Sequence, residues 1–552
     1  MTGATFLEEQ MGETVSDYIV VGAGASGCVV AGRLSEGSSR VTVLEAGPDD
    51  KSVYLKIPAL SFMVMSKNEY NWNFETEPVP GLDGRRLNIL SGKVVGGSST
   101  INGLVYSRGF SRDFDYWQQL GCTGWSISEI LPYFKRSEAS ERGEGPFHGA
   151  TGPVSTRRGG SKLPIYRAFL QAIADEGYPV VDDLASDREG FGYFDTNVSP
   201  RGLRMSAATT YLRPAIKRGN LNLLTRTSVR RVLVENGRAV GVEAVHEGCV
   251  KTFRARAEVI LSAGAIKTPQ LLMLSGVGPG AHLAQAGVAT LVDSPEVGAN
   301  YQNHVPYTLQ YLCHSAVSAF GYLKPLTAMK LGLQYALLRR GPLAESVFGV
   351  GGTFRSDNHV ETPNIQVVMA GAIVLGAGTA NSELKSERSF RNHLPTAEGF
   401  AVNVYQGSPN SRGRIRLRSS NPDDAPLIDA NHLSDPRDMQ TLMTAVKSMR
   451  KAMQQPAIRQ YISREVSPGE AVDDDKALEA EIRRNGGTVS HQCGTCAMGH
   501  KDRSVVDSKL RVRGLDGLRI VDTSIVPIIP NATIHSLALM IGERGADFIR
   551  SS

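Results

Sequence analysis

Residues 17–45 read DYIVVGAGASGCVVAGRLSEGSSRVTVLE, and this stretch decides the fold. It joins an apolar strand, a Gly-x-Gly-x-x-Gly turn at Gly22, Gly24 and Gly27, a helical segment and a second strand that ends at Glu45. Such glycines permit a tight turn, a close approach of backbone amides to a pyrophosphate, and close packing of helix on strand. The carboxylate of Glu45 follows at the spacing expected for a ribose contact. The stretch predicts a dinucleotide-binding unit; the alternative is a glycine-rich turn in an ordinary parallel sheet.

Small residues follow strand-like segments at further places along the chain. Residues 92–99 read GKVVGGSS between apolar flanks, and such a loop can lie against a flat ring or a diphosphate. Residues 257–261, which read AEVIL, are strand-like and lead into a small-residue turn, after which we expect a helix at 270–275. Asn236 and Gly237 predict a two-residue hairpin between two strands. Return strands of this kind complete a nucleotide-binding sheet.

The composition is that of an ordinary globular protein, and the length suggests two to four domains or fewer large ones. Of its 552 residues, 41% are hydrophobic and 21% charged, and the net charge is only +5, so we expect no nucleic-acid partner. No apolar run is long enough to span a bilayer. The first 16 residues contain three Glu and lack the basic start of a secretory signal. Six cysteines are too few for a disulfide framework, and we therefore expect a cytoplasmic protein.

Residues 490–499, which read SHQCGTCAMG, are the richest chemical cluster near the C-terminus. Cys493 and Cys496 have the spacing of a redox dithiol, and with His491 they resemble the start of a metal site. No second ligand cluster accompanies them in the sequence, so we expect no metal. A neutral imidazole, with an ordinary pKa near 6.5, is the side chain best matched to taking a proton near neutral pH.

Five blocks of the chain resemble the glucose-methanol-choline (GMC) flavin oxidoreductase family, in its choline- and alcohol-dehydrogenase-like branch. In the family's order, these blocks are residues 20–47, 92–106, 262–278, 297–304 and 491–547. Together they extend over nearly the whole chain, which is far more specific than any single motif. The resemblance implies that FAD, rather than NAD, is the cofactor and that the reaction is the oxidation of an alcohol.

The same resemblance implies an α/β fold with an α+β cap. Residues 17–162, 210–305 and 479–552 would form a Rossmann-like FAD-binding domain, and 163–209 and 306–478 a discontinuous sheet-plus-helix substrate-binding domain. A cap of this kind encloses a pocket over the flavin and excludes water. From composition, the cap segments predict helices at 164–176, 323–339 and 436–453 and strands at 363–370, 400–406 and 413–417.

The cofactor residues implied by the resemblance lie in the glycine turn, the second small-residue loop, and the carboxyl ends of later strands. Some family members attach FAD covalently through a histidine at the position of Ile101, so we expect a non-covalent flavin here. The implied cofactor residues are Gly22, Gly24, Ala25, Ser26, Gly27, Glu45, Ala46, Gly92, Val95, Gly96, Ser99, Asn102, Gly103, Leu104, Val105, Val229, Ala263, Gly264, Asp522, Thr523, Thr533 and Ile534.

The resemblance assigns the catalytic base to His491, which would take the hydroxyl proton while a hydride passes to flavin N5. Many relatives carry Asn or His at the position of Thr533 and often Asn at that of His535, so this chain departs from the pattern. Thr533 and His535 are both candidate partners of His491. We expect Asn531 to cap a helix that starts near Ile534 and directs its positive end at the flavin.

The expected substrate is an uncharged primary alcohol, aliphatic or aromatic, that becomes the aldehyde. In choline-type relatives an acidic residue often follows Gly-Pro-Leu by a few positions, whereas here Glu345 comes early, which argues against a quaternary ammonium substrate. Four apolar residues are candidates for the pocket lining, or equally for the core: Leu343, Val347, Phe348 and Phe354.

Other functions remain open from the sequence. They are choline dehydrogenation, a non-redox flavoprotein of the same fold such as a hydroxynitrile lyase, and an NAD-dependent or purely nucleotide-binding protein. The acceptor that reoxidises the flavin would be oxygen or a quinone-type carrier. The sequence does not decide between these two acceptors.

Overall fold

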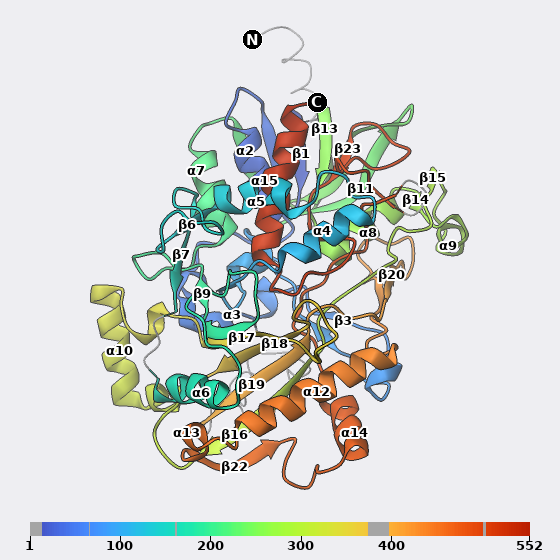
Figure 1. The fold of residues 1–552 in the computed structure, drawn as a ribbon. Helices are drawn as coiled ribbons and strands as arrows, with labels where there is room; N and C mark the ends of the chain where they lie inside the picture. Colours follow the sequence, from blue (N-terminus) through green and yellow to red (C-terminus); the bar gives the residue numbers. More distant parts are fainter. Residues whose placement is uncertain (1–13, 66, 160–162, 374–396, 501–503) are drawn as a thin grey trace.

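The computed structural model arranges the chain around two sheets (Figure 1). Residues 1–13, on which the expectation of a missing secretory signal rests, lie outside its described part. Among the described residues, no helix combines the length and the apolar character needed to cross a bilayer. The described residues are 14–65, 67–159, 163–373, 397–500 and 504–552.

The first sheet has seven strands and grows from the glycine-turn unit. Its order is β10-β2-β1-β13-β12-β11, and β23 pairs with β13. The strands β10, β2, β1 and β23 run parallel to their neighbours, whereas β11, β12 and β13 form an antiparallel meander. The strands are β1 (Thr14–Val21), β2 (Val41–Leu44), β10 (Leu221–Leu224), β11 (Thr227–Glu235), β12 (Arg238–His246), β13 (Cys249–Leu261) and β23 (Leu518–Ile520).

Helices α2 (Ala25–Leu34) and α15 (His535–Arg550) pack against one another beside this sheet (Figure 1). Their contact is buried because both helices are apolar where they meet: Val29 and Val30 of α2 and Ile541 of α15 are fully buried. Ser26 strengthens the contact, since its hydroxyl donates to the carbonyl of Ala538 at 2.7 Å. A helix near the start of the described chain and the last helix thus lie side by side.

The glycine turn requires glycine for reasons visible in the backbone. Gly22 has φ of 98°, a conformation that side chains disfavour. A Cβ on Gly27 would lie 2.1 Å from the carbonyl oxygen of Gly22, so α2 approaches β1 too closely for any side chain there. The predicted hairpin is also present, with φ of 49° at Asn236 and 77° at Gly237, as a two-residue turn requires. The predicted dinucleotide-type fold is therefore confirmed.

The helix expected at 270–275 is longer at its N-terminal end, and spans Gly264–Leu274 as α8. Pro269 lies inside it and lacks the N–H that would bond to the carbonyl of Ala265. That carbonyl accepts instead from the Thr495 hydroxyl at 2.6 Å. A distant residue therefore satisfies the group that the proline leaves free, which the local sequence does not reveal.

The second sheet is antiparallel and has six strands, in the order β22-β16-β19-β18-β17-β8. Helices α6 (Pro164–Asp175) and α12 (Pro436–Ala452) pack on it, within two residues of their predicted ends. All six strands lie within the segments expected to form the substrate-binding domain. The strands are β8 (Gly190–Tyr193), β16 (Pro306–Cys313), β17 (Phe348–Phe354), β18 (Ile365–Ala370), β19 (Gly399–Gln406) and β22 (Ile462–Ser467).

The strand expected at 413–417 is not part of this cap sheet. It forms β20 (Arg414–Arg416), which pairs with β21 (Leu427–Asp429) as a separate two-stranded sheet. Gly413 and Tyr301 exchange backbone hydrogen bonds at 2.9 Å, which holds this ribbon beside the segment that precedes β16. The strand composition was recognisable in the sequence, but its pairing partner was not.

Alternate residues of the six-stranded sheet face the space between the two sheets. On β16 these are Thr308 and Gln310, and on β19 they are Ala401, Asn403 and Tyr405. Thr308 pairs with Asn403, and Gln310 with Ala401, so the five side chains share one face. This face forms one wall of the cavity described below.

Candidate active site

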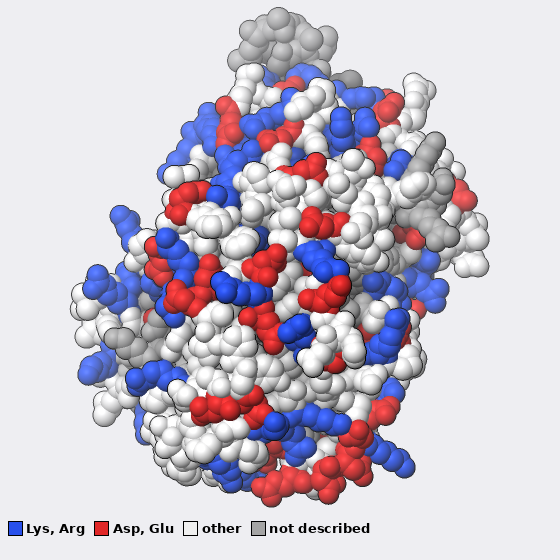
Figure 2. All heavy atoms as spheres, in the orientation of Figure 1, with Lys and Arg blue, Asp and Glu red and all other residues white. Residues whose placement is uncertain are grey.

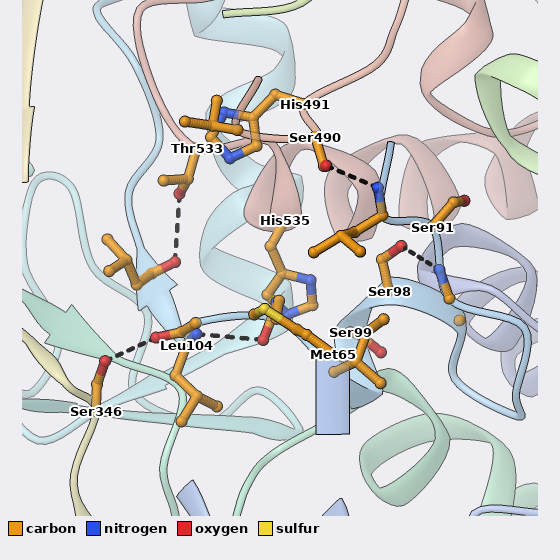
Figure 3. Close-up of a pocket in the computed structure, with 18 of the residues that line it drawn as sticks. Met65, Ser91, Ser98, Ser99, Leu104, Ser346, Ser490, His491, Thr533 and His535 are labelled. Carbon is orange, nitrogen blue, oxygen red and sulfur yellow. Dashed lines mark hydrogen bonds between the residues drawn. The ribbon is translucent and has the colours of Figure 1, made fainter. Parts of the chain in front are cut away.

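A cavity of about 1170 Å³ lies between the two sheets (Figure 3). Ligand pockets usually enclose ~300–1,000 Å³, so this one is large enough for a dinucleotide and a small substrate together. The residues predicted to hold the cofactor line this cavity, except for Gly27, Val95 and Gly96. The three predicted catalytic residues, His491, Thr533 and His535, line the same cavity.

The three exceptions shape the loops from behind the cavity wall. Gly27 lies against the backbone of the turn, as described above. Gly96 has φ of 92°, and its N–H donates to the carbonyl of Ala23 at 2.7 Å. Val95 is fully buried, and its N–H donates to the carbonyl of Pro48 at 3.1 Å. These residues hold the two glycine loops together without reaching the cavity.

The cradle formed by the two glycine loops fits the phosphate part of a dinucleotide. A Cβ on Gly97 would lie 2.8 Å from Cα of Gly24, so the loops meet backbone to backbone. No side chain caps the N-terminus of α2, where Gly24 is the N-cap. The first amides of the helix therefore remain available to an anion. Gly22, Gly24 and Gly92 all line the cavity here.

Glu45 lines the cavity beside this cradle and holds the turn together. One carboxylate oxygen accepts from the N–H of Ala23 at 2.8 Å, and the other from the N–H of Gly47 at 2.8 Å. Burial raises the pKa of Glu45 to about 7, against the opposing effect of these two hydrogen bonds. Each oxygen keeps a second lone pair, so a ribose hydroxyl can still donate to this carboxylate.

Trp72 and Lys267 also line the cavity, although neither was predicted from the sequence as a site residue. The ammonium of Lys267 lies 5.0 Å from the centroid of the Trp72 ring, and that of Lys93 lies 4.6 Å from it. Burial, with the charge of Lys93, lowers the pKa of Lys267 to about 8. Two cations at one ring complement an anionic ligand. Lys267 lies within a family block, in an otherwise uncharged segment. A single charge in such a segment was the signal that could have indicated a functional residue.

His491 pairs with a second histidine, His304. The two Nδ1 atoms lie 2.9 Å apart, and Nε2 of His304 lies 2.8 Å from the carbonyl oxygen of Gly407. A carbonyl only accepts, so Nε2 of His304 carries that ring's proton and its Nδ1 carries a lone pair. The proton between the rings therefore belongs to Nδ1 of His491, which donates to His304. Nε2 of His491 is left with its lone pair free to take a proton.

The surroundings keep both histidines neutral. Burial lowers the pKa of His491 well below its ordinary value, and the neighbouring His304 lowers it further. Burial also lowers the pKa of His304 to about 4. The N–H of the His491 backbone donates to Oδ1 of Asn303 at 2.7 Å, and the preceding Ser490 adopts φ of 62°. Such a strained backbone next to an imidazole is typical of a functional position.

Thr533 and His535 face the same cavity from different directions (Figure 3). The Thr533 hydroxyl donates to the carbonyl of Val105 at 3.3 Å, and the Ser107 hydroxyl lies 2.9 Å from it. The side-chain amide of Asn197 donates to Nε2 of His535 at 3.5 Å. Burial, with the charge of Arg204, lowers the pKa of His535 to about 4. Neither side chain is hydrogen-bonded to His491, whose ring partner within the described chain is His304.

The residue expected to cap the last helix has another role. Helix α15 begins at His535 after Ile534, and no side chain caps it. The amide of Asn531 donates instead to the carbonyl of Pro363, and its backbone N–H to Asp113 at 3.1 Å. The prediction of a cap at Asn531 is therefore wrong. The uncapped N-terminal amides of α15 lie at the cavity wall, where their partial positive charge favours developing negative charge.

On the substrate side, Leu343, Val347 and Phe348 line the cavity, but Phe354 does not. Phe354 is buried and stacks on Phe191 at 6.1 Å. The register of β17 shifts between Phe348 and Val350, so strict alternation does not carry Phe354 to the face of Phe348. Phe354 is therefore a core residue, which is one of the two alternatives that the sequence left open. Glu345, which the sequence analysis took as an argument against a cationic substrate, lines the cavity as well.

The alternative uses of the C-terminal cysteines find no support. Cys493 and Cys496 are both free and buried, and burial raises the pKa of each thiol. A redox dithiol requires the opposite shift. Within the described residues, the group with metal-ligand spacing is His148, Asp183 and Asp195, whose ligand atoms lie within 4.8 Å of one another. It shares no residue with the cavity.

Similar proteins identify the family. Models of the N- and C-terminal parts of the GMC oxidoreductases match residues 16–306 and 409–542. The oxygen-dependent choline dehydrogenase of Sinorhizobium fredii is 39% identical over 538 residues, which cover 97% of this chain and 95% of that protein. The crystal structure of pyridoxine 4-oxidase from Mesorbium loti is 29% identical, with a TM-score of 0.86 over 97% of this chain and 99% of the other.

A formate oxidase has the same fold, with a TM-score of 0.89 at 24% identity over 98% of this chain and 99% of the other. The matches extend over both sheets and the cavity between them. They agree with the glycine cradle and with the family blocks of the sequence. The chain belongs to the GMC oxidoreductase family and is an FAD-dependent oxidoreductase.

Proposed function

We propose that this protein oxidises an uncharged primary alcohol, aliphatic or aromatic, to the aldehyde, with His491 as the base. The observation that carries the proposal is the hydrogen bond between His304 and His491, which leaves a lone pair on Nε2 of His491. The alcohol hydroxyl gives its proton to this nitrogen, and its carbon loses a hydride. When bound, FAD supplies the hydride acceptor. Loss of the proton and the hydride converts the alcohol to the aldehyde.

The chain's own residues supply the remaining requirements of this chemistry. The Thr533 hydroxyl and the His535 imidazole line the same cavity and serve as hydrogen-bonding partners for the substrate oxygen. The apolar side chains of Leu343, Val347 and Phe348 exclude water from the reacting carbon. A comparison of the variants Thr533→Ala and His535→Ala distinguishes which of the two side chains contacts the substrate oxygen.

The flavin in this proposal is non-covalent. Ile101 is at the position where some family members carry the attaching histidine, and an aliphatic side chain forms no such bond. Denaturation in acid should therefore release all yellow colour into the supernatant. Six free cysteines support a reducing, cytoplasmic setting. Oxygen or a quinone-type carrier completes the cycle as electron acceptor.

Glu345 favours a second candidate, the oxidation of a quaternary ammonium alcohol. A carboxylate beside aromatic rings suits such a cation, and Tyr166, Tyr322 and Phe348 line the cavity with Glu345. The related choline dehydrogenases point the same way. Choline and 3,3-dimethylbutan-1-ol have the same shape and differ in charge. A higher kcat/KM for choline that is lost in Glu345→Gln would establish the second candidate in place of the first.

The proposed function is tested by an anaerobic screen of alcohols with the purified holoenzyme. A substrate should bleach the flavin absorbance, and the colour should return after oxygen or a quinone is admitted. Turnover of a cyanohydrin without bleaching would instead support a non-redox lyase. Purified protein without a flavin spectrum would contradict the proposed cofactor.

A further inference from the structure

Helix α10 (Pro325–Leu338) presents an apolar face to the outside of the molecule. Tyr335 is its one buried residue, and the Tyr335 hydroxyl donates to the carbonyl of Gly202 at 2.9 Å. Figure 1 shows the helix at the left margin, away from the six-stranded sheet. Spacings of three and four residues place the outward apolar side chains on one face. These side chains, between 60% and 79% exposed, are Leu326, Met329, Leu333 and Leu337.

The opposite face of α10 forms part of the cavity wall. Ala328, Leu331 and Gln334 of the helix line the cavity, and so does Leu323 just before it. Helix α10 alone therefore separates the candidate active site from the exposed apolar face. None of the four outward apolar side chains contributes to the cavity lining. Substitutions on the outer face can thus be made without altering a site residue.

The surroundings of the apolar face are basic. Lys324, Lys330, Arg339 and Arg340 are all exposed on or beside α10. No Asp or Glu occurs anywhere in residues 297–344. At the left edge of Figure 2, where α10 lies, Lys and Arg side chains flank uncharged surface. An apolar ridge with a basic rim complements an anionic lipid surface, where acyl chains meet negative headgroups.

We propose that the outer face of α10 docks on an anionic lipid bilayer. The helix would lie in the interface, with Leu326, Met329, Leu333 and Leu337 toward the acyl chains and the basic side chains at the headgroups. Fourteen residues are too few to span the hydrocarbon core, so the helix rests on the membrane without crossing it. Docking brings the cavity wall to the phase in which apolar alcohols and quinones dissolve.

A second copy of the chain is a poorer occupant of the same face. A two-fold contact through α10 would bring the same patch from both copies together. Lys330 and the Arg339–Arg340 pair of one copy would then lie near their counterparts, with no acidic residue of 297–344 to compensate. An anionic bilayer removes this repulsion, since its headgroups pair with the cations.

Sedimentation of the FAD-loaded full-length protein with vesicles tests the proposal. We expect binding to vesicles of equal phosphatidylglycerol and phosphatidylcholine, weaker binding to pure phosphatidylcholine, and loss of the difference at high salt. The double variant Leu326→Gln/Leu333→Gln should bind the anionic vesicles at least about tenfold more weakly than the wild type does. The double variant Lys324→Gln/Lys330→Gln should lose mainly the preference for anionic lipid.

The matched control is Val250→Gln/Leu291→Gln, which replaces two exposed apolar residues of the other half and should leave vesicle binding unchanged. Unchanged flavin content and thermal midpoint of each variant show that folding is intact. The proposal is overturned if the wild-type protein fails to bind anionic vesicles, or if the Leu326/Leu333 variant binds them equally well. A lipid-free dimer that the leucine substitutions dissociate, without vesicle binding, would assign the face to a second copy.

Discussion

The half of the molecule built on the seven-stranded sheet, called here the cofactor half, and the half built on the six-stranded sheet, called the cap half, form their sides of the cavity in different ways. In the cofactor half the wall is backbone: Gly22, Gly24 and Gly97 bring two loops together with no side chain between them. In the cap half the wall is one face of a sheet, where Asn403 and Tyr405 project from alternate positions of β19. The first side is rigid and tied to one ligand shape. The second can be changed residue by residue without altering the fold.

This difference separates affinity for the cofactor from choice of substrate. A backbone cradle recognises features common to every FAD molecule, so it tolerates almost no substitution. A sheet face tolerates new side chains, which is how one family acts on different alcohols. His491 and His304 lie where the two halves meet, since His304 lies two residues before β16 and His491 belongs to the C-terminal segment.

Gly27→Val should have the largest effect, which is the loss of flavin binding by the cofactor half. The new Cβ would meet the carbonyl oxygen of Gly22 at 2.1 Å, so helix α2 must move off the sheet. We expect protein without bound flavin, measured by the ratio of absorbance at 450 and 280 nm. Gly37→Ala is the matched control, because a Cβ there meets nothing within 4 Å. A yellow Gly27→Val protein would refute the view that backbone contact specifies this half.

His304→Leu should have the next largest effect, and it acts through His491. The substitution removes the acceptor for Nδ1–H of His491, so the ring loses the hydrogen bond that fixes its tautomer. We expect the rate of anaerobic flavin reduction to fall by about 10- to 100-fold, with kcat affected more than KM. His304→Gln, which keeps an accepting oxygen, should recover part of the rate. Equal rates in both variants would argue against His304 as a positioning residue.

A cluster around His148 should make stability depend on pH. Burial opposes the charged form of His148, but the carboxylates of Asp183, in the loop before β8, and Glu138, in β6 (Glu138–Ser140), outweigh it and raise its pKa to about 9. Since the unfolded value is near 6.5, this contribution is complete below pH ~6.5 and is lost as pH rises through ~9. The shift corresponds to at most about 3 kcal/mol.

Urea unfolding at several pH values measures this contribution. The difference in unfolding free energy between the wild type and His148→Gln should be largest near pH 6.5 and should shrink toward pH 9. Comparing the two proteins at each pH removes the effects of other titrating groups. A difference that stays constant over this range would show that His148 is not protonated between its two carboxylates.

The sequence predicted correctly, in both halves, the elements whose signals are local. The glycine turn, the hairpin at Asn236 and the helices α6 and α12 all follow from neighbouring residues. The wrong prediction, the helix cap at Asn531, concerns a partner that is distant in the chain, since Asn531 bonds to Pro363. The choice between pocket lining and core for Phe354 also depended on a distant partner, Phe191. The composition of a strand does not indicate which of its faces is buried or which other strand pairs with it.

The pairing of His304 with His491 is the clearest example in the candidate site. The two residues are 187 positions apart, and each belongs to a family block that had been recognised separately. Nothing in either block indicates that the rings touch. The sequence therefore predicted the base but assigned its partner to Thr533 or His535, whereas the ring hydrogen bond goes to His304.

The most direct test of the account is the rate of anaerobic flavin reduction in His491→Ala, measured by stopped flow with the best alcohol from the screen. Absorbance before mixing shows that the variant still holds FAD, so that loss of cofactor is excluded. We predict a fall of roughly 10²- to 10⁴-fold, the usual contribution of a general base. A flavin-loaded His491→Ala protein that is reduced as fast as the wild type would contradict the central claim that this imidazole takes the hydroxyl proton.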